Sequence, residues 1–418
     1  WSLLVTYRFG CYGVSHSVID GGLRSLTMHN NSGAMPLEDT MADLEGKDAI
    51  DQARAIISAG GRIDVDLGLS LYKNAPLMEL GELAHSMKKK MHGEKIHFNL
   101  NLHVNTTNIC VLACRFCAFR KGSKHEDAYD LSVEEYLDRV RPYSNSIDEV
   151  HSVGGLHPEW TIEHYERLYR AMKKEFPHIS IKSLTAVEVK HIAKRTGITI
   201  PQTLTRLMDA GLDALPGGGA EILVDSVRDR ICRGKESSLE YLSIHRAAHE
   251  VGLPTNCTML FGTVETLEDR ITHLDLLRKL QDETSGFQCF VPYPFLPDRT
   301  RLPEAKIPSA EEVLRTISIS RLMLDNIPHL KAYRMNIGDD LASIAILNGA
   351  DDLDGTVERE EIMHSAGSNT PLNTGMDGLI RIIESTGQSA IQRNTTYSRF
   401  KSHTLKNRSE PKRLPVAR

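Results

Sequence analysis

The chain has 418 residues, of which 40% are hydrophobic and 25% charged, as in an ordinary globular protein. A formal net charge of −5 argues against a dedicated nucleic-acid or membrane-surface binder, and no apolar run reaches the roughly 18 residues of a membrane-spanning helix. The seven cysteines are too few for a disulfide framework, and three of them fall within residues 110–117, which predicts a metal site in a reducing, cytoplasmic setting.

The first segment, residues 1–46, shows no clear periodicity and begins with Trp1. Met28, Met35 and Met41 are all plausible starts. We therefore expect residues 1–46 to be a disordered or non-native extension.

Regular patterns begin at Lys47, with one helix ending at Gly60 and a second expected near residues 77–91. An extended stretch, residues 97–105, then predicts the first strand. Beyond it, short apolar runs alternate with helical patterns. We expect strands at 149–153, 179–184, 213–215, 255–261, 287–291 and 330–335, and helices near 133–140, 162–176, 187–195, 201–210, 239–251, 267–281 and 311–325.

Several of these helices carry end signals. Two begin with Ser and Glu at capping-box spacing, and two are followed by a glycine that favours a helix stop. These residues are Ser132 with Glu135, Ser309 with Glu312, Gly211, and Gly252.

Repeated strand–helix units predict a parallel sheet with right-handed crossovers, and six or more units predict closure into an α/β barrel of the TIM type. We place the barrel core at residues 97–335, after an N-terminal helical segment at 47–96. Residues 336–397 would close the barrel as a C-terminal helical elaboration. Residues 398–418, rich in Lys and Arg, are expected to be a disordered tail.

The chemical motif lies directly after the first predicted strand. Cys110, Cys114 and Cys117 have the spacing C-x3-C-x2-C, so one short loop presents three thiolates. Thiolates suit iron–sulfur clusters, and three of them leave the fourth iron of a cubane open. The alternative is a zinc site, but a closed structural zinc site needs four ligands, and no second C-x2-C pair exists. Cys257 and Cys289 fall in strand-like runs and are interpreted as core residues.

With this spacing, the chain resembles the radical S-adenosylmethionine (SAM) superfamily. The resemblance implies a 4Fe–4S cluster whose open iron chelates SAM, with reductive cleavage to a 5′-deoxyadenosyl radical. It implies that Phe116 packs near the adenine and that Gly154 and Gly155 approach the SAM ammonium through their backbone. Met259 and Gly262 match the superfamily's fifth-strand motif, which lines the adenine pocket. Plain core packing is the alternative for Phe116.

A closer resemblance covers about residues 47–397. It extends to the subgroup containing aminofutalosine synthase, cyclic dehypoxanthinylfutalosine synthase and the deazaflavin (FO) synthase subunits. It rests on the phrases Val153-Gly-Gly-Leu-His-Pro158, Pro216-Gly-Gly-Gly-Ala-Glu-Ile222, Gln281-Asp-Glu-Thr-Ser-Gly-Phe287 and Asp351-Asp-Leu-Asp-Gly-Thr-Val357.

Within the subgroup, three phrases resemble aminofutalosine synthases: Lys182-Ser-Leu-Thr-Ala-Val-Glu188, Leu324–Tyr333 and His364-Ser-Ala-Gly367. Arg334 departs from the pattern, since an aromatic residue is common there.

This resemblance implies that the adenosyl radical adds to the enol ether of carboxyvinyloxy-benzoate, with rearrangement and loss of bicarbonate, on the route to menaquinone. SAM would then be consumed as a co-substrate, and a flavodoxin or ferredoxin would supply the electron. The alternatives are a hydrogen-abstracting relative and, from another class, a zinc-stabilised barrel without catalytic activity.

A substrate with two carboxylates needs cationic donors at the barrel mouth. The candidates are His157, Lys182, Arg299 and Arg334, each with a structural charge as the alternative. Three further residues can hold ribose hydroxyls or substrate, namely Thr185, Glu188 and Glu221.

Two loops carry further expectations. The glycine-rich run at 216–219 is expected to bring backbone close to a ligand, with a tight turn as the alternative. The acidic cluster at 351–354 can be a cation site, although we favour a solvated loop.

Overall fold

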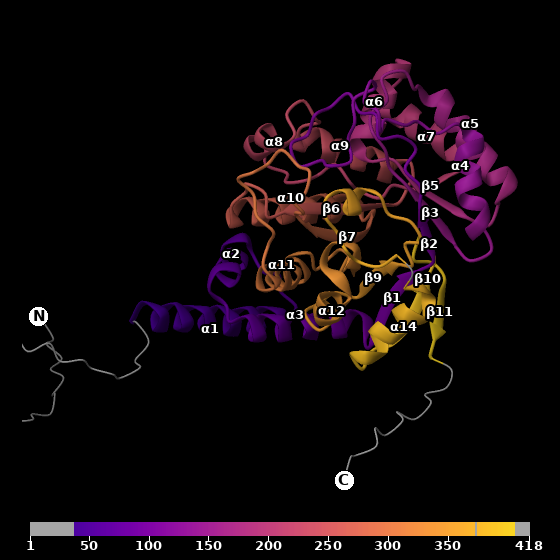
Figure 1. Cartoon of the computed structure of the whole chain (residues 1–418). Helices are drawn as coiled ribbons and strands as arrows, with labels where there is room; N and C mark the ends of the chain where they lie inside the picture. Colours follow the sequence, from indigo (N-terminus) through magenta and orange to yellow (C-terminus); the bar gives the residue numbers. More distant parts are fainter. Residues whose placement is uncertain (1–36, 373, 406–418) are drawn as a thin grey trace, which may run out of the picture.

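The computed structural model describes residues 37–372 and 374–405, and their side chains from residue 45 onward. Parallel strands form a closed ring with helices around it (Figure 1). β2 to β5 are neighbours in one sheet, and β6 to β8 in a second. Parallel bridges from Leu215 to Thr255 and from Lys331 to Asp352 join the sheets, and β9 pairs back with β1. The expected α/β barrel is therefore confirmed.

The ring strands are short and buried on both faces, as parallel strands covered by helices must be. The first predicted strand is divided at Leu100 into β1 and β2, which belong to different sheets. The strands are β1 Lys95–Asn99, β2 Asn101–His103, β3 Glu149–Ser152, β4 Ser180–Ser183, β5 Leu212–Ala214, β6 Thr255–Phe261, β7 Phe287–Pro294, β8 His329–Leu330, β9 Asp352–Gly355, β10 Ser389–Arg393 and β11 Phe400–His403.

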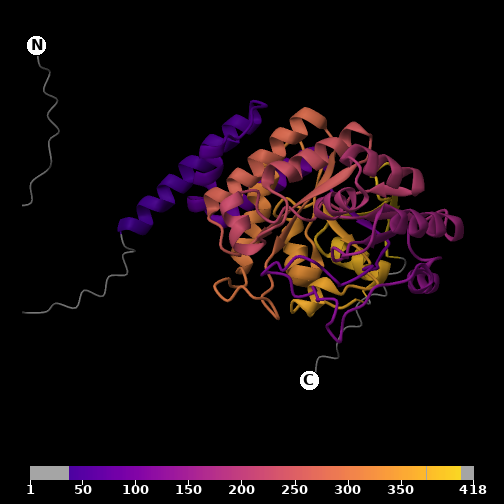
Figure 2. The ribbon, with the colours of Figure 1, turned by 90° about the horizontal axis from the view of Figure 1, so that it is seen from above.

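Helices pack against the outside of the ring (Figure 2). They are α1 Leu37–Ser58, α2 Val65–Asn74, α3 Leu77–His92, α4 Val133–Val140, α5 Ile162–Glu175, α6 Ala186–Thr196, α7 Ile200–Ala210, α8 Asp225–Ile231, α9 Ser238–Glu250, α10 Leu267–Thr284, α11 Ala310–Met323, α12 Arg334–Ile346, α13 Ile362–Ser365 and α14 Gly375–Ser385, with a 3-10 turn at Arg141–Tyr143. No helix in the described part of the chain is long and apolar enough to cross a membrane.

The helix ends follow the predicted signals. Ser132 and Glu135 form a complete capping box at α4, and α7 ends at Gly211, whose φ is 120°. At α11, Ser309 accepts a hydrogen bond from the Glu312 amide at 3.1 Å. Local sequence thus determines where these helices begin and end.

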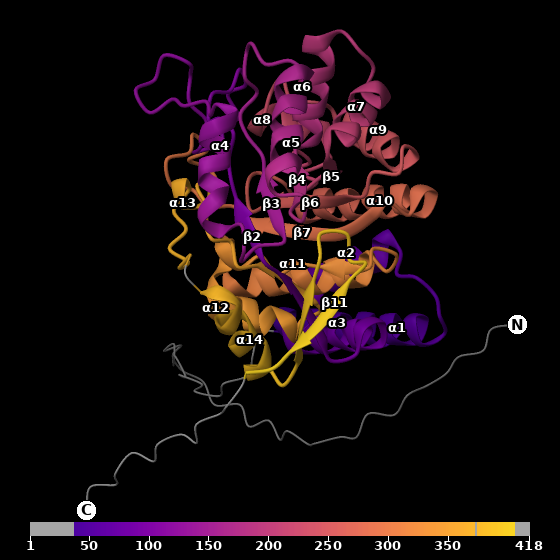
Figure 3. The same ribbon diagram turned by 90° about the vertical axis from the view of Figure 1, so that its right-hand side faces the viewer.

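The N-terminal helices lie along one side of the barrel, where α2 packs on α10 and α11, and α3 packs on α11 (Figure 3). Helix α1 begins at Leu37, before the boundary expected at residue 47. The prediction for residues 1–36 lies outside the described residues.

Two predictions about the C-terminal part are wrong. β10 adds to β1 in parallel, and β11 pairs antiparallel with β10, so residues 400–403 form a sheet edge rather than part of a disordered tail. The acidic run is not a solvated loop, since Asp351, Asp352 and Asp354 are all buried against cationic or imidazole side chains.

Candidate active site

The cysteine loop, residues 105–119, leaves the barrel after β2. Cys110, Cys114 and Cys117 are free thiols, and all three line one cavity. Burial raises the pKa of Cys114 to about 12 and also raises the pKa of Cys117. Without metal both are therefore protonated, and a metal must displace their protons when it binds. Three sulfurs on one loop fit three irons of a cubane and leave its fourth iron free for another ligand.

The backbone of this loop is held at several points by segments distant in sequence. The Val111 amide donates to the Leu156 carbonyl at 3.0 Å, and the Arg115 amide donates to the Ile231 carbonyl at 2.7 Å. The Arg301 guanidinium donates to the Ala113 carbonyl at 2.6 Å. The spacing of the thiols is therefore set before any ligand arrives.

Glycines after β3 allow a close approach to the same loop. A Cβ on Gly155 would lie 2.1 Å from the Ile109 carbonyl oxygen, and a Cβ on Gly154 would lie 2.7 Å from Thr106 Oγ1. Both glycines line the cavity. Besides the expected approach to SAM, the structure therefore shows a second reason for glycine at these positions: the backbone beside Cys110 packs directly against them.

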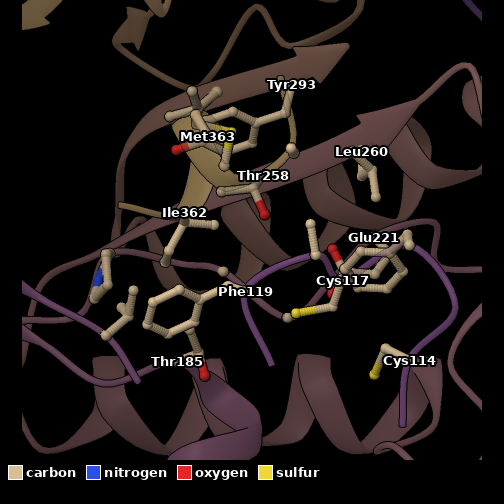
Figure 4. Close-up of a pocket in the computed structure, with 18 of the residues that line it drawn as sticks. Cys114, Cys117, Phe119, Thr185, Glu221, Thr258, Leu260, Tyr293, Ile362 and Met363 are labelled. Atoms are coloured by element: carbon tan, nitrogen blue, oxygen red, sulfur yellow. The ribbon is translucent and has the colours of Figure 1, made fainter. Parts of the chain in front are cut away.

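The cavity has a volume of about 290 Å³ and lies at the C-terminal ends of the barrel strands. Figure 4 shows Cys114 and Cys117 on one side and Tyr293 and Met363 toward the other. Phe119 is a further apolar lining residue. The volume is at the lower end of the range for small-molecule sites.

A charged pair lies beside the cysteine loop. Lys235 is ion-paired with Glu221, and its ammonium lies 5.7 Å from the centre of the Phe116 ring. Burial acts to lower the pKa of Lys235, but the Glu221 and Glu236 carboxylates raise it above its ordinary value. Lys235 therefore provides a permanent positive charge at the cluster side of the cavity.

The floor of the cavity is polar. His103 and His151 stack with ring centres 4.4 Å apart, and His103 Nε2 is buried with no hydrogen-bond partner among the described residues. Burial lowers the pKa of both rings, so both are neutral at pH 7. Lys331, paired with Asp354, lies at the same end. The floor thus combines two neutral imidazoles with a buried ion pair, and His103 Nε2 lies 3.9 Å from Asp354 Oδ2.

Of the residues expected at SAM, Phe116 and Thr185 line the cavity, as the two glycines do, whereas Met259 and Gly262 do not. Met259 is fully buried in the core, and its strand neighbours Thr258 and Leu260 line the cavity instead. Successive side chains of a strand point to opposite faces, which explains the change by one position. The Gly262 amide donates to Glu265 at 2.6 Å, so this turn is held by the chain itself.

Glu188 is occupied by structural contacts. It forms a capping box with Thr185 at the start of α6 and accepts a hydrogen bond from the Gly154 amide at 3.0 Å. Burial raises the pKa of Glu188 to about 7. Its contacts link α6 to the glycine turn, while Thr185 itself faces the cavity.

None of the four expected cationic donors lines this cavity. His157 stacks on Trp160 at 4.5 Å, and Arg334 is fully buried and paired with Asp339 at 2.7 Å. Lys182 is buried inside the barrel, 4.0 Å from Glu149. Arg299 lines a neighbouring surface groove of about 710 Å³. Among the expected polar contacts, Glu221 and Thr185 are the two that the structure brings to the cavity.

Sequence reasoning missed several lining residues. Lys235 lies in a loop with no periodic signal, and Asn256 and Thr258 lie in a strand of which only Met259 was expected at the cavity. His103 and His151 occupy paired positions on β2 and β3. Each of these histidines lies near the end of its strand, and this shared position was the sequence signal that could have predicted them as lining residues.

Two family models cover most of the chain. The Radical SAM superfamily model matches residues 104–277, and the CofH/MqnC C-terminal region matches residues 284–406. Their junction falls within α10, the helix that leads into β7. The strands of one closed ring are thus shared between the two matched regions.

Known proteins support the same assignment. The aminodeoxyfutalosine synthase of Thermus thermophilus is 40% identical over 82% of this chain and 93% of that protein. The cyclic dehypoxanthine futalosine synthase of Streptomyces coelicolor is 35% identical over 83% of this chain and 88% of that protein. The hydrogenase maturase HydG of Carboxydothermus hydrogenoformans superposes with a TM-score of 0.67 at 17% identity, covering 86% of this chain and 83% of that one, which supports the fold.

These matches decide against the zinc-stabilised scaffold that the cysteine spacing alone left open. The chain is an enzyme that belongs to the radical SAM superfamily, in the branch that carries the CofH/MqnC C-terminal region.

Proposed function

We propose that this enzyme is an aminodeoxyfutalosine synthase that joins the 5′-deoxyadenosyl group of SAM to carboxyvinyloxy-benzoate, with rearrangement and loss of bicarbonate. The observation that carries the proposal is the 40% identity to a synthase of that name over 93% of its length. When bound at Cys110, Cys114 and Cys117, a 4Fe–4S cluster supplies the electron that cleaves SAM.

The charged pair beside the cysteine loop suits the SAM end of the cavity. Lys235 can hold the carboxylate of SAM, while Glu221 fixes the position of the Lys235 ammonium. Phe116 lies within reach of this charge. Thr185 presents a polar side chain to the same cavity.

The opposite end suits a small aromatic acid. Lys331 lines this end, and its positive charge can attract a substrate carboxylate. Tyr293 and Tyr333 pack edge to face at 5.2 Å and line the cavity, so they can contact an aryl ring. The apolar wall at Phe119 and Leu260 excludes water, which protects a reactive radical.

The electron must come from a separate carrier, and we propose a flavodoxin or ferredoxin. The groove that contains Arg299 also reaches Cys117 and includes Arg120 and Arg301. The groove also carries Asp127, Glu360 and Glu361, so the attraction of an acidic carrier would come from the arginines at its Cys117 end.

An anaerobic assay tests the synthase assignment. Protein with a reconstituted cluster is incubated with SAM, a reductant and a small panel of acceptors, and products are identified by mass spectrometry. The synthase consumes SAM and carboxyvinyloxy-benzoate together and places the adenosyl carbons in the product. Release of free 5′-deoxyadenosine in step with turnover of dehypoxanthinylfutalosine or of an FO precursor would show a hydrogen-abstracting relative instead.

A further inference from the structure

A histidine cluster lies at the opposite end of the barrel strands from the active-site cavity. His92 ends α3, His97 lies in β1, His329 begins β8, and Asp351 directly precedes β9. His97 stands at the start of the β1–β2 stretch whose far end carries His103. The cluster is therefore separate from the proposed reaction.

Three ring nitrogens converge on one carboxylate oxygen. The distances to Asp351 Oδ2 are 2.6 Å from His329 Nδ1, 3.2 Å from His97 Nδ1 and 3.6 Å from His92 Nε2. One ligand atom from each of the four residues lies within 4.8 Å of the others. In a tetrahedral zinc site with bonds of about 2.0–2.1 Å, neighbouring ligand atoms are about 3.3 Å apart. The measured distances to Oδ2 bracket that value.

The other carboxylate oxygen is held independently. Asp351 Oδ1 accepts hydrogen bonds from the Arg321 guanidinium and from the Leu330 amide, the latter at 2.8 Å. This leaves Oδ2 directed at the imidazoles. Ligating carboxylates in metal sites are commonly oriented by such outer hydrogen bonds.

Stacking fixes the rings as well. The rings of His92 and His329 stack at 4.9 Å, and Tyr397 covers His329 at 3.9 Å. The side chains of His97 and Asp351 are 4% and 0% exposed, while that of His92 is 13% exposed. The site is therefore largely formed in advance, with His92 as the most exposed of these ligands.

The geometry points to a binding site for one divalent transition-metal ion, with Zn²⁺ as the best fit, formed by His92, His97, His329 and Asp351. Imidazole ligands favour Zn²⁺ over Mg²⁺ or Ca²⁺, which prefer oxygen. Arg321 offsets the charge of Asp351, so the carboxylate attracts cations less strongly. The three imidazoles therefore supply most of the selectivity for Zn²⁺ over Mg²⁺ and Ca²⁺.

Binding requires that the ring nitrogens facing the ion be unprotonated. The His92 Nε2–H, which donates to the Pro328 carbonyl at 2.8 Å, gives up that bond, and the protons on Nδ1 of His97 and His329 leave to solvent or move to Nε2. The ion would then tie α3 and β1 to β8 and β9. β8 and β9 meet at the parallel bridge between Lys331 and Asp352, which joins two of the sheets of the ring.

Zinc alone is the probe in the test. Holoenzyme with its cluster in place is loaded with Zn²⁺ and desalted, and its zinc content and thermal midpoint are measured. Wild type is expected to keep one zinc ion per chain beyond the cluster iron and to unfold at a higher temperature with zinc. His97→Asn and His329→Asn, which keep a donor toward Asp351 but lose a metal ligand, are expected to bind zinc at least about tenfold more weakly.

His178→Asn is the matched control, because His178 is exposed and bonds only to the Ser144 carbonyl, at 2.9 Å. It is expected to retain the zinc. Should the inner variants fail to fold, His92→Asn makes the same test at the most exposed ligand. Wild type that retains no zinc and shows no thermal shift, or equal zinc retention in the ligand variants, would overturn the proposal. Neither result would bear on the reaction proposed above.

Discussion

The Lys235 ammonium lies between the Glu221 carboxylate and the Phe116 ring, beside the cysteine loop. The Lys235 and Glu221 side chains are only 8% and 11% exposed. A buried ion pair contributes little net stability, but losing one partner leaves the other charge uncompensated. These residues therefore couple the stability of the fold to the electrostatics of the site.

Replacement of Lys235 by Met tests this coupling. Lys235→Met is expected to lower the free energy of unfolding by about 3–5 kcal/mol, because Glu221 stays buried without its partner. Lys235→Met/Glu221→Leu should recover most of that loss. Urea denaturation of the cluster-free protein provides the comparison, and equal losses in both variants would contradict the account.

Cys114→Ala tests the thiol assignment. We expect the variant to keep its far-ultraviolet circular dichroism while losing cluster binding and turnover, since two thiolates cannot replace three. Cys257→Ala is the control, because that thiol is fully buried in β6 away from the cavity. Iron content and anaerobic activity are measured for both, and full activity of Cys114→Ala would refute the site.

At the scale of elements, the turn after β3 and the start of α6 act as one support. The Gly155 amide donates to the Thr107 carbonyl at 2.8 Å, and the Gly154 amide donates to Glu188. The cysteine loop, the glycine turn and the helix therefore hold one another in place.

Substitution of a turn glycine should disturb the cluster site. In Gly155→Ala the new Cβ meets the Ile109 carbonyl oxygen at 2.1 Å, so the backbone beside Cys110 must shift. We expect reduced iron content after reconstitution and at least a tenfold loss of activity, or about 1.4 kcal/mol. Gly122→Ala, where a Cβ meets open space, should resemble wild type. Normal iron content and activity in Gly155→Ala would show that the loop tolerates the shift.

Glu188 predicts a pH dependence of stability. Its pKa is raised by burial to about 7 from the ordinary 4.5, so between these values the folded state binds the additional proton. Its contribution to stability therefore falls as pH rises from about 4.5 to 7 and is constant above. The free energy of unfolding of Glu188→Gln minus that of wild type should therefore increase from pH 5 to pH 8. Urea denaturation at both values checks this, and a pH-independent difference would contradict it.

At the scale of the whole molecule, the barrel places a polar floor and a cysteine loop at opposite sides of one cavity. Of the ring strands, β3 to β6 lie in the first matched region and β7 to β9 in the C-terminal one, while β1 and β2 precede both. Neither region alone contains the complete ring. The C-terminal region is thus part of the barrel and contributes Tyr293, Lys331 and Asp354 to the cavity.

Sequence alone predicted the strand–helix alternation and the cysteine loop, because both are local patterns. It did not predict which side chains of β6 face the cavity. That strand is buried on both faces, so no polar alternation distinguishes Met259 from Thr258. Glu188 was likewise predicted as a ligand contact, although Thr185 and Glu188 have capping-box spacing; only the hydrogen bond from the distant Gly154 amide had no local signal.

The central claim is that three thiolates hold a cluster with one iron free to bind SAM. Electron paramagnetic resonance of the anaerobically reduced protein, recorded before and after addition of SAM, measures this most directly. We expect a reduced 4Fe–4S signal whose g values shift when SAM is added, and no such signal in Cys114→Ala. A protein that contains no iron after anaerobic reconstitution, or a spectrum that SAM leaves unchanged, would contradict it.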